Sequence, residues 1–94
     1  MKLSCEIKVK NRFGLHARPA GLIVKLLQNS ASTVAFTYKE NTVNARSIMG
    51  LLTLGAGNNA LINVEVDGED AEETLKQLTE VFERQFGEER AHAG

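Results

Sequence analysis

The sequence is poor in the features of disulfide-linked, metal-bound and membrane-spanning proteins. It contains one cysteine, Cys5, one proline and no tryptophan, and aromatic residues make up 5% of the chain. A lone thiol forms neither an internal disulfide nor a cysteine-based zinc site, which excludes disulfide-stapled secreted domains and zinc fingers. No apolar run approaches the roughly 20 residues that a membrane-spanning helix needs. Charges interrupt the first residues at once, where a signal peptide would be apolar, so we expect a cytoplasmic protein.

Size and charge indicate one ordinary globular domain with an uneven charge distribution. The 94 residues fit one domain, and 43% hydrophobic with 24% charged residues is usual for a folded protein. Residues 1–66 contain eight Lys and Arg against three Asp and Glu, a net +5, whereas residues 67–94 contain three against nine, a net −6. The basic part has few aromatics and no dense basic run, so we expect no nucleic-acid partner. It suits phosphate groups or acidic protein surfaces better.

Hydrophobic periodicity predicts the element order β-α-β-β-α-β-α. Alternation predicts strands at residues 4–10, 34–38, 42–45 and 62–66, with a tight turn at Glu40-Asn41. Helical spacing predicts helices at residues 17–28, 48–54 and 71–86, the last one ended by Gly87. Strands with one apolar face favour an antiparallel sheet covered on one side, so the fold class is α+β in two layers. We expect one domain over residues 1–87 and a frayed C-terminal tail at residues 88–94.

The most informative residue is His16, which directly precedes the first predicted helix. A helix N-terminus offers unpaired backbone N–H groups and a partial positive charge, which together favour an anion such as phosphate. Arg18 adds a planar guanidinium within reach, and Pro19 fits the first helical turn, where its missing N–H is not needed. A histidine that carries a phosphoryl group needs these parts. The spacing is also compatible with an ordinary histidine at a helix start and a solvated arginine.

Familiar catalytic motifs are missing from the sequence. It contains no GxxxxGK[ST] loop, no GxGxxG turn and no HExxH helix, and it suggests no Ser-His-Asp triad. The carboxylates of the last predicted helix repeat at the spacing of a solvated amphipathic face. The sequence therefore offers little support for an enzyme of these classes.

Ser47 is the second candidate site, because it is expected to cap a short apolar helix. An N-cap serine stabilises a helix by about 1 kcal/mol, and a phosphate there would also be favoured by the helix N-terminus. The apolar residues Ile48, Met49 and Leu52 follow, and they could form an exposed docking patch. Spacing alone leaves open that Ser47 is only a cap and that these apolar side chains are only core.

Two longer segments, GLHARPA at residues 14–20 and VNARSIMGLLTL at residues 43–54, resemble a known family. The first is similar to the active-site motif of the HPr family, the histidine-containing phosphocarriers of the bacterial phosphoenolpyruvate-dependent phosphotransferase system. The second is similar to the regulatory serine segment of that family. Their separation fits the family, and the element order fits from Lys2 to about Gly87. The resemblance favours the functional interpretation of His16, Arg18 and Ser47.

The resemblance implies an open-faced β-sandwich, with a four-stranded antiparallel sheet and three helices on one face. It also implies a phosphocarrier rather than an enzyme, with no cofactor and no metal. In such a carrier, His16 accepts a phosphoryl group on Nδ1 from phospho-enzyme I and passes it to a sugar-specific enzyme IIA. Arg18 would support the phosphoryl charge, and the backbone N–H groups of Ala17 and Arg18 would bind the phosphoryl oxygens.

For the second segment, the resemblance implies regulatory phosphorylation of Ser47 by HPr kinase/phosphorylase, with a transcriptional regulator as a further partner. Ile48, Met49 and Leu52 would form the docking patch for enzyme I. We expect a monomer that does not insert into membranes.

The sequence departs from the family at several positions after the second segment. Asn58-Asn59 replaces a common Lys-Gly pair, and Leu61 is apolar where a polar residue is usual. Asn59 is able to adopt the left-handed conformation of the glycine. The departures bear on which enzyme IIA is used, and on whether the pathway is sugar uptake, nitrogen-related or purely regulatory. The alternative to a sugar-uptake carrier is a regulatory interaction module that acts mainly through its phosphorylation state.

Overall fold

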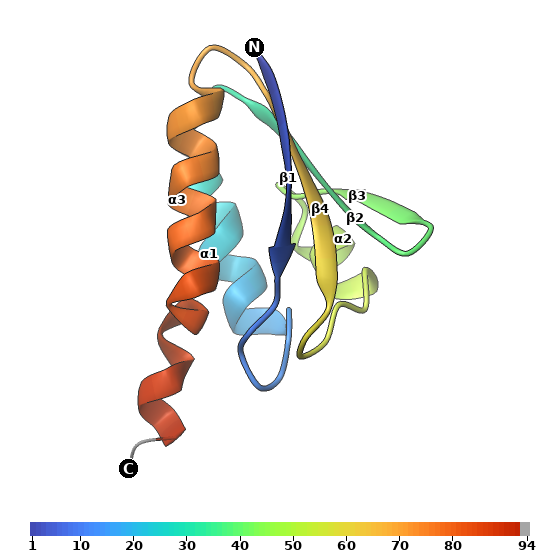
Figure 1. Cartoon of the computed structure of the whole chain (residues 1–94), viewed down its shortest axis with the longest axis vertical. Helices are drawn as coiled ribbons and strands as arrows, with labels where there is room; N and C mark the ends of the chain where they lie inside the picture. Colours follow the sequence, from blue (N-terminus) through green and yellow to red (C-terminus); the bar gives the residue numbers. More distant parts are fainter. Residues whose placement is uncertain (93–94) are drawn as a thin grey trace.

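The structure is a computed structural model that describes the backbone of residues 1–92 and the side chains of residues 1–88. Figure 1 shows a twisted sheet with helices packed against it. The elements in chain order are β1 (Lys2–Lys8), α1 (Ala17–Leu27), β2 (Thr33–Tyr38), β3 (Asn41–Asn44), α2 (Ile48–Thr53), β4 (Leu61–Asp67), α3 (Ala71–Glu83) and the 3-10 helix η1 (Gln85–His92). Up to α3, the predicted order is confirmed.

The four strands form one antiparallel sheet in the order β1-β4-β2-β3. In β4, Ile62 pairs with Ile7 of β1, and Val64 pairs with Phe36 of β2. Because both neighbours of β4 run against it, β1 and β2 are parallel to each other, and α1 lies in the long crossover that parallel strands require. The loop at residues 9–16, which carries the chain from β1 into α1, contains the predicted histidine.

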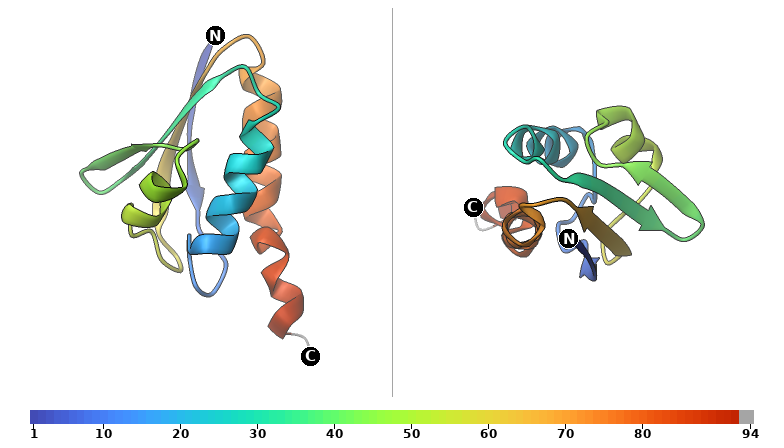
Figure 2. Two further views of the ribbon diagram at one scale, coloured as in Figure 1. Left: turned by 180° about the vertical axis from the view of Figure 1, so that it is seen from behind. Right: turned by 90° about the horizontal axis from the view of Figure 1, so that it is seen from above.

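One core lies between the covered face of the sheet and the helices. In β4, the buried Ile62, Val64 and Val66 alternate with exposed or half-buried residues, and in β1 the inward side chains are buried at Ile7 and half-buried at Leu3 and Cys5. Phe36 of β2 packs against Phe82 of α3 with 6.0 Å between ring centroids. Together with these two rings, the largest fully buried side chains include Ile23, Leu27, Leu51, Ile62 and Leu78. The views in Figure 2 place α1, α2 and α3 on the same face of the sheet, which confirms the open-faced α+β sandwich.

The β2–β3 hairpin turns one residue earlier than predicted. The ladder extends to Asn41, so Lys39 and Glu40 form the turn. Lys39 has a φ of 56°, a left-handed conformation that hairpins usually give to glycine or asparagine. Asparagine is common in turns, but the pairing of Phe36 with Val43 sets the register of this hairpin and places Asn41 in β3.

The last helix also ends earlier than predicted, and a left-handed turn follows it. α3 ends at Glu83, and Gln85, Phe86 and Gly87 have φ values of 53°, 54° and 78°. A left-handed residue other than glycine costs roughly 1–2 kcal/mol. Burial of the Phe86 ring against Phe82, with 4.9 Å between centroids, offsets part of that cost. The sequence missed the turn because the apolar spacing continues to Phe86 with a helical period.

This turn changes the position of Glu88, which the sequence assigned to a frayed tail. The Glu88 side chain is only 9% exposed and contacts the start of α1. The Glu88 carboxylate is held inside the fold, because it finds hydrogen-bond partners there. Ala93 and Gly94, the last residues of the predicted tail, lie outside the described residues.

At the opposite end of α3, Asp70 joins this helix to the loop that follows α1. Its carboxylate accepts hydrogen bonds from the Ser32 hydroxyl at 2.5 Å, the Ala31 N–H at 2.9 Å and the Ser30 hydroxyl at 3.4 Å. We call this set of contacts the Asp70 clamp. The hydrogen bonds, from Ser32 first and Ala31 second, hold the pKa of Asp70 below its ordinary value.

Candidate functional site

The structure places His16 at the N-cap of α1, as the sequence predicted. Its backbone is extended, with φ −83° and ψ −170°, and its carbonyl oxygen accepts the first helical hydrogen bond, from the Ala20 N–H at 3.0 Å. The imidazole makes no capping hydrogen bond. Because the ring is not used to cap the helix and is 39% exposed, it is available for chemistry.

One glycine and two asparagines hold the loop that positions His16. Gly14 has a φ of +69°, and a Cβ at this position would lie 2.5 Å from the Ala56 carbonyl oxygen. The residue after Gly14 donates its N–H to that same oxygen at 3.0 Å. Asn58, one of the departures from the family pattern, donates from Nδ2 to the carbonyl oxygen of Asn11 at 3.1 Å. These contacts fix the loop against the segment that precedes β4.

The first turn of α1 presents positive groups beside His16. Helix geometry provides no intrahelical acceptor for the N–H groups of Ala17 and Arg18, and Pro19 has no N–H to satisfy. The exposed Arg18 side chain extends toward Glu88, with 3.9 Å between Nη1 and Oε2. The positive end of the helix dipole and the guanidinium together stabilise an anionic group at this position.

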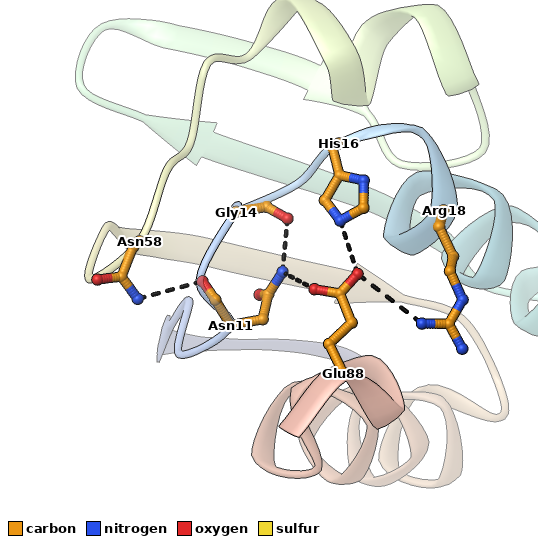
Figure 3. Close-up of polar contacts among 6 residues, drawn as sticks. All are labelled: Asn11, Gly14, His16, Arg18, Asn58 and Glu88. Atoms are coloured by element: carbon orange, nitrogen blue, oxygen red, sulfur yellow. Dashed lines mark hydrogen bonds and ion pairs between the residues drawn. The ribbon is translucent and has the colours of Figure 1, made fainter. Parts of the chain in front are cut away.

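Glu88, which the sequence did not assign to the site, contacts both predicted side chains. Its Oε2 lies 2.6 Å from Nε2 of His16 and 3.9 Å from Nη1 of Arg18 (Figure 3). Its Oε1 accepts a hydrogen bond from Nδ2 of the buried Asn11 at 2.9 Å. The same Nδ2 donates to the carbonyl oxygen of Gly14 at 2.7 Å. Three segments of the chain therefore meet at one carboxylate.

The sequence carries only a faint signal for this contact. A glycine directly after a helix often reverses the chain, and Gly87 precedes Glu88 immediately. His16 and Glu88 are 72 positions apart in the sequence, however, and they come together only when α3 packs beside α1. Local pattern therefore could not have paired these two residues.

Exposed apolar side chains lie beside His16 and on α2. The exposed Phe13 ring lies edge-on to His16, with 6.1 Å between ring centroids. On α2, which packs against α1, the residues Ile48, Met49 and Leu52 are all exposed, Met49 most of all at 69%. The exposure that a docking patch requires is therefore present.

Ser47 caps α2 as predicted. Its Oγ accepts a hydrogen bond from the Gly50 N–H at 3.0 Å. Of the departures from the family pattern, Asn59 adopts the left-handed conformation with a φ of 71°, which confirms that prediction. Leu61 is 52% exposed, and it alternates with the buried Ile62, so it lies on the open face of the sheet.

The groups gathered at His16 are an exposed ring nitrogen, a guanidinium, helix N–H donors and a carboxylate. Together they are suited to accept a phosphoryl group and to stabilise its charge. Among the described side chains, those of residues 1–88, no three of His, Cys, Asp or Glu come together in a way that could hold a metal ion. Within residues 1–92, no helix has both the length and the apolar character to cross a bilayer.

Comparison with known proteins places the chain in one family. The family profile described as "PTS HPr component phosphorylation site" matches residues 3–84. The phosphocarrier protein HPr of Chlamydia muridarum is 45% identical over 87 residues, which cover 93% of this chain and 84% of the relative.

Solved structures similar to this chain are also HPr proteins. The crystal structure of HPr-C-His from Thermoanaerobacter tengcongensis matches with a TM-score of 0.86 at 36% identity, covering 90% of this chain and 96% of that one. An HPr dimer from the same organism matches with a TM-score of 0.72 at 38% identity, covering 85% and 92%. The matched residues 3–84 span the positions of His16, Arg18 and Ser47, and they end before Glu88. The chain therefore belongs to the HPr family, the histidine-containing phosphocarrier proteins of the bacterial phosphoenolpyruvate-dependent phosphotransferase system, which carry a phosphoryl group and are not enzymes.

Proposed function

We propose that Nδ1 of His16 accepts a phosphoryl group from phospho-enzyme I and passes it to an enzyme IIA domain. The observation that carries this proposal is the position of the ring, exposed at the N-terminus of α1 with only Nε2 engaged by Glu88. A phosphoryl group on Nδ1 lies within the influence of the helix dipole and of the N–H groups of Ala17 and Arg18. The Arg18 guanidinium stabilises the charge of that group during transfer.

The direct test is incubation with enzyme I and phosphoenolpyruvate, followed by measurement of acid-labile phosphate on the chain. The unchanged chain should be labelled to about one phosphate per molecule. His16→Ala should fold normally, because the ring is partly exposed, and should take up no label. An unlabelled natural chain, or a labelled His16→Ala variant, would contradict the proposal.

For docking, we propose that the apolar patch of Ile48, Met49 and Leu52 contacts enzyme I. Its support is the exposure of the patch on α2, which packs beside the helix that His16 begins. Met49→Glu places a charge in the contact and should raise the KM for this chain as a substrate of enzyme I. Leu61→Glu is the matched control, because it makes the same change at an exposed apolar residue on the open face of the sheet. Equal KM values for the two variants would contradict the docking proposal.

The relay is proposed to operate in the cytoplasm with the chain as a monomer. One chain supplies His16, Arg18, Glu88 and the helix N–H groups, so the site needs no second copy. Light scattering at the concentrations used for phosphorylation tests this point. A dimer that is phosphorylated without dissociating would contradict the monomeric carrier.

A second candidate function is regulation through Ser47 phosphorylation. It is supported by the position of Ser47 at the start of α2, directly before the exposed patch. A phosphate there adds negative charge beside the docking surface, and in this proposal HPr kinase/phosphorylase adds it and a transcriptional regulator reads it. The pathway would then be nitrogen-related or purely regulatory rather than sugar uptake.

Incubation with HPr kinase/phosphorylase and ATP tests the regulatory function. Acid-stable phosphate should be found on the natural chain and not on Ser47→Ala. If enzyme I labels His16 and the kinase labels nothing, the carrier function stands and the regulatory function is contradicted.

A further inference from the structure

We infer that Glu88 is a positioning residue for His16, and that it holds the imidazole in the tautomer whose Nδ1 is free to receive a phosphoryl group. The inference rests on the proposed function of His16. It assigns a role to a residue that lies beyond the part of the chain matched by the family profile.

The contact between the two side chains fixes where the ring proton lies. An ionised carboxylate can only accept hydrogen bonds. A separation of 2.6 Å between Oε2 and Nε2 therefore requires the proton on Nε2. In a neutral imidazole one nitrogen carries the proton and the other carries a lone pair. Nδ1 of His16, which points away from Glu88 in Figure 3, consequently carries the lone pair.

Asn11 determines which oxygen of Glu88 faces the histidine. Its Nδ2 donates both to the carbonyl oxygen of Gly14 and to Oε1 of Glu88. A flipped amide would bring Oδ1 against the Gly14 oxygen, and two acceptors cannot share that contact. The amide keeps its orientation although, among the described residues, its buried Oδ1 has no hydrogen-bond partner. The network is therefore arranged around the contact with Glu88.

The backbone before Glu88 gives independent support. Gln85, Phe86 and Gly87 are successive residues in the left-handed region, and two of them are not glycine. Such conformations persist only where the surrounding structure enforces them, and they gather at functional sites. Here the turn directs a nearly buried carboxylate onto the one histidine of the family motif.

The transfer step explains why a carboxylate is useful at Nε2. The lone pair of Nδ1 forms a bond to the phosphorus of a phosphohistidine donor while the donor's nitrogen–phosphorus bond breaks and its electron pair returns to the donor ring. A donor ring that is protonated on its other nitrogen leaves as a neutral imidazole, and His16, which keeps its Nε2 proton, becomes positively charged. Glu88 lies directly against that new charge and stabilises it without any proton being moved.

Replacing the carboxylate by an amide should invert the tautomer. In Glu88→Gln, the Nδ2 donor of Asn11 attracts the carbonyl oxygen of the introduced amide, so its NH2 group turns toward His16. An NH2 group donates, and it therefore favours a lone pair on Nε2 and the proton on Nδ1. The attacking nitrogen is then blocked, although size and packing are almost unchanged.

The experiment combines nitrogen NMR of the His16 ring, in alkaline solution where ordinary histidines are neutral, with the rate of phosphorylation by enzyme I. The natural chain should show the proton on Nε2. Glu88→Gln should shift the proton to Nδ1 and should slow phosphorylation about ten- to a hundredfold, the usual loss for a carboxylate that orients a histidine. Glu72→Gln is the control, because it makes the same change in an exposed residue of α3, and it should alter neither quantity.

Glu88→Ala provides a second variant if the amide disturbs the fold. Without the acceptor, both tautomers should be populated, and the rate should fall less than in Glu88→Gln. An unchanged tautomer in either variant would overturn the inference, even if the rate falls, because the loss would then come from structure alone. A natural chain that takes up no phosphate would contradict the proposed function instead, and the tautomer measurement would still decide the role of Glu88.

Discussion

An acidic residue lies beyond each end of α3, Asp70 before it and Glu88 after it, and the contacts of the two carboxylates differ in kind. At the start of α3, the Asp70 carboxylate accepts hydrogen bonds from two hydroxyl groups and one backbone N–H of the loop that follows α1. After the end of α3, the Glu88 carboxylate accepts a hydrogen bond from the side-chain amide of Asn11 and contacts the ring of His16, the N-cap residue of α1.

The difference lies in what each carboxylate binds. The donors to Asp70 keep their protons at every ordinary pH, so the Asp70 clamp can only hold the loop in place. Glu88 binds a ring that exists in two tautomers and can gain charge, so its contact acts on a reactive group. Of these two carboxylates, Asp70 before α3 holds the structure in place, and Glu88 beyond the end of α3 is the one that we propose acts on the chemistry of His16.

The largest expected effect that tests this contrast is at Arg18. Arg18→Ala should slow phosphorylation of His16 about a hundredfold, the usual loss when one charge-stabilising group is removed, and should not abolish it, because Arg18 forms no bond to phosphorus. Thermal stability should stay nearly unchanged, since the side chain is exposed. Single-turnover phosphorylation by enzyme I measures the loss. Lys25→Ala, at an exposed lysine of the same helix, is the control and should keep the normal rate.

At the other end, Arg46 supports the loop of the Asp70 clamp. Its guanidinium donates to the carbonyl oxygens of Leu27, Ser30 and Ser32 at 2.7, 2.7 and 2.6 Å. Arg46→Ala should lower the free energy of unfolding by about 2 kcal/mol, with normal phosphorylation of His16. Arg46→Lys should recover only part of this loss, because an ammonium group cannot span three carbonyls. Denaturant unfolding measures the free energy of both variants. An Arg46→Ala variant of full stability that is phosphorylated slowly on His16 would contradict a purely structural role for this end of α3.

The Asp70 clamp itself predicts a pH dependence of stability. Hydrogen bonds lower the pKa of Asp70 in the fold from an ordinary value of 3.8, so the stability it adds is present above that value. It is lost as the pH falls through the lower folded value. Asp70→Asn should therefore be less stable than the natural chain at neutral pH, and the difference should shrink below about pH 4. Unfolding free energies measured from neutral to acidic pH would show this, and a constant difference would contradict it.

The smallest expected effect concerns Ser47, which lies at neither end of α3. Ser47→Asp keeps an acceptor for the Gly50 N–H and places negative charge at a helix start, so stability should hold or rise by about 0.3–1 kcal/mol. Ser47→Ala should lose about 1 kcal/mol. Ser47→Asp should also slow phosphorylation at low enzyme I concentration, because its charge lies beside the docking patch. The melting temperature and the rate of His16 phosphorylation test these expectations. A stable Ser47→Asp variant that is phosphorylated at the normal rate would show that Ser47 is only a helix cap.

The parts of the molecule that the sequence predicted are those that local pattern determines. The alternation of strands and the spacing of helices follow from burial on one face, so the element order and the cap at Ser47 were predictable. The turn at Lys39-Glu40 was not, because the strand register overrode the preference of asparagine for turns. Glu88 was missed for a related reason: three left-handed residues are unfavourable locally and are tolerated only because Phe86 is buried and the carboxylate finds partners on α1.

The most direct test of the account is to identify which nitrogen of His16 carries phosphorus after incubation with enzyme I and phosphoenolpyruvate. Phosphorus–nitrogen couplings in a nitrogen-labelled chain distinguish the two ring positions. The account predicts phosphorus on Nδ1 and a proton on Nε2, still in contact with Glu88. Phosphorus on Nε2 would show that Glu88 leaves the ring before transfer, and a chain without phosphorus on His16 would contradict the phosphocarrier site itself.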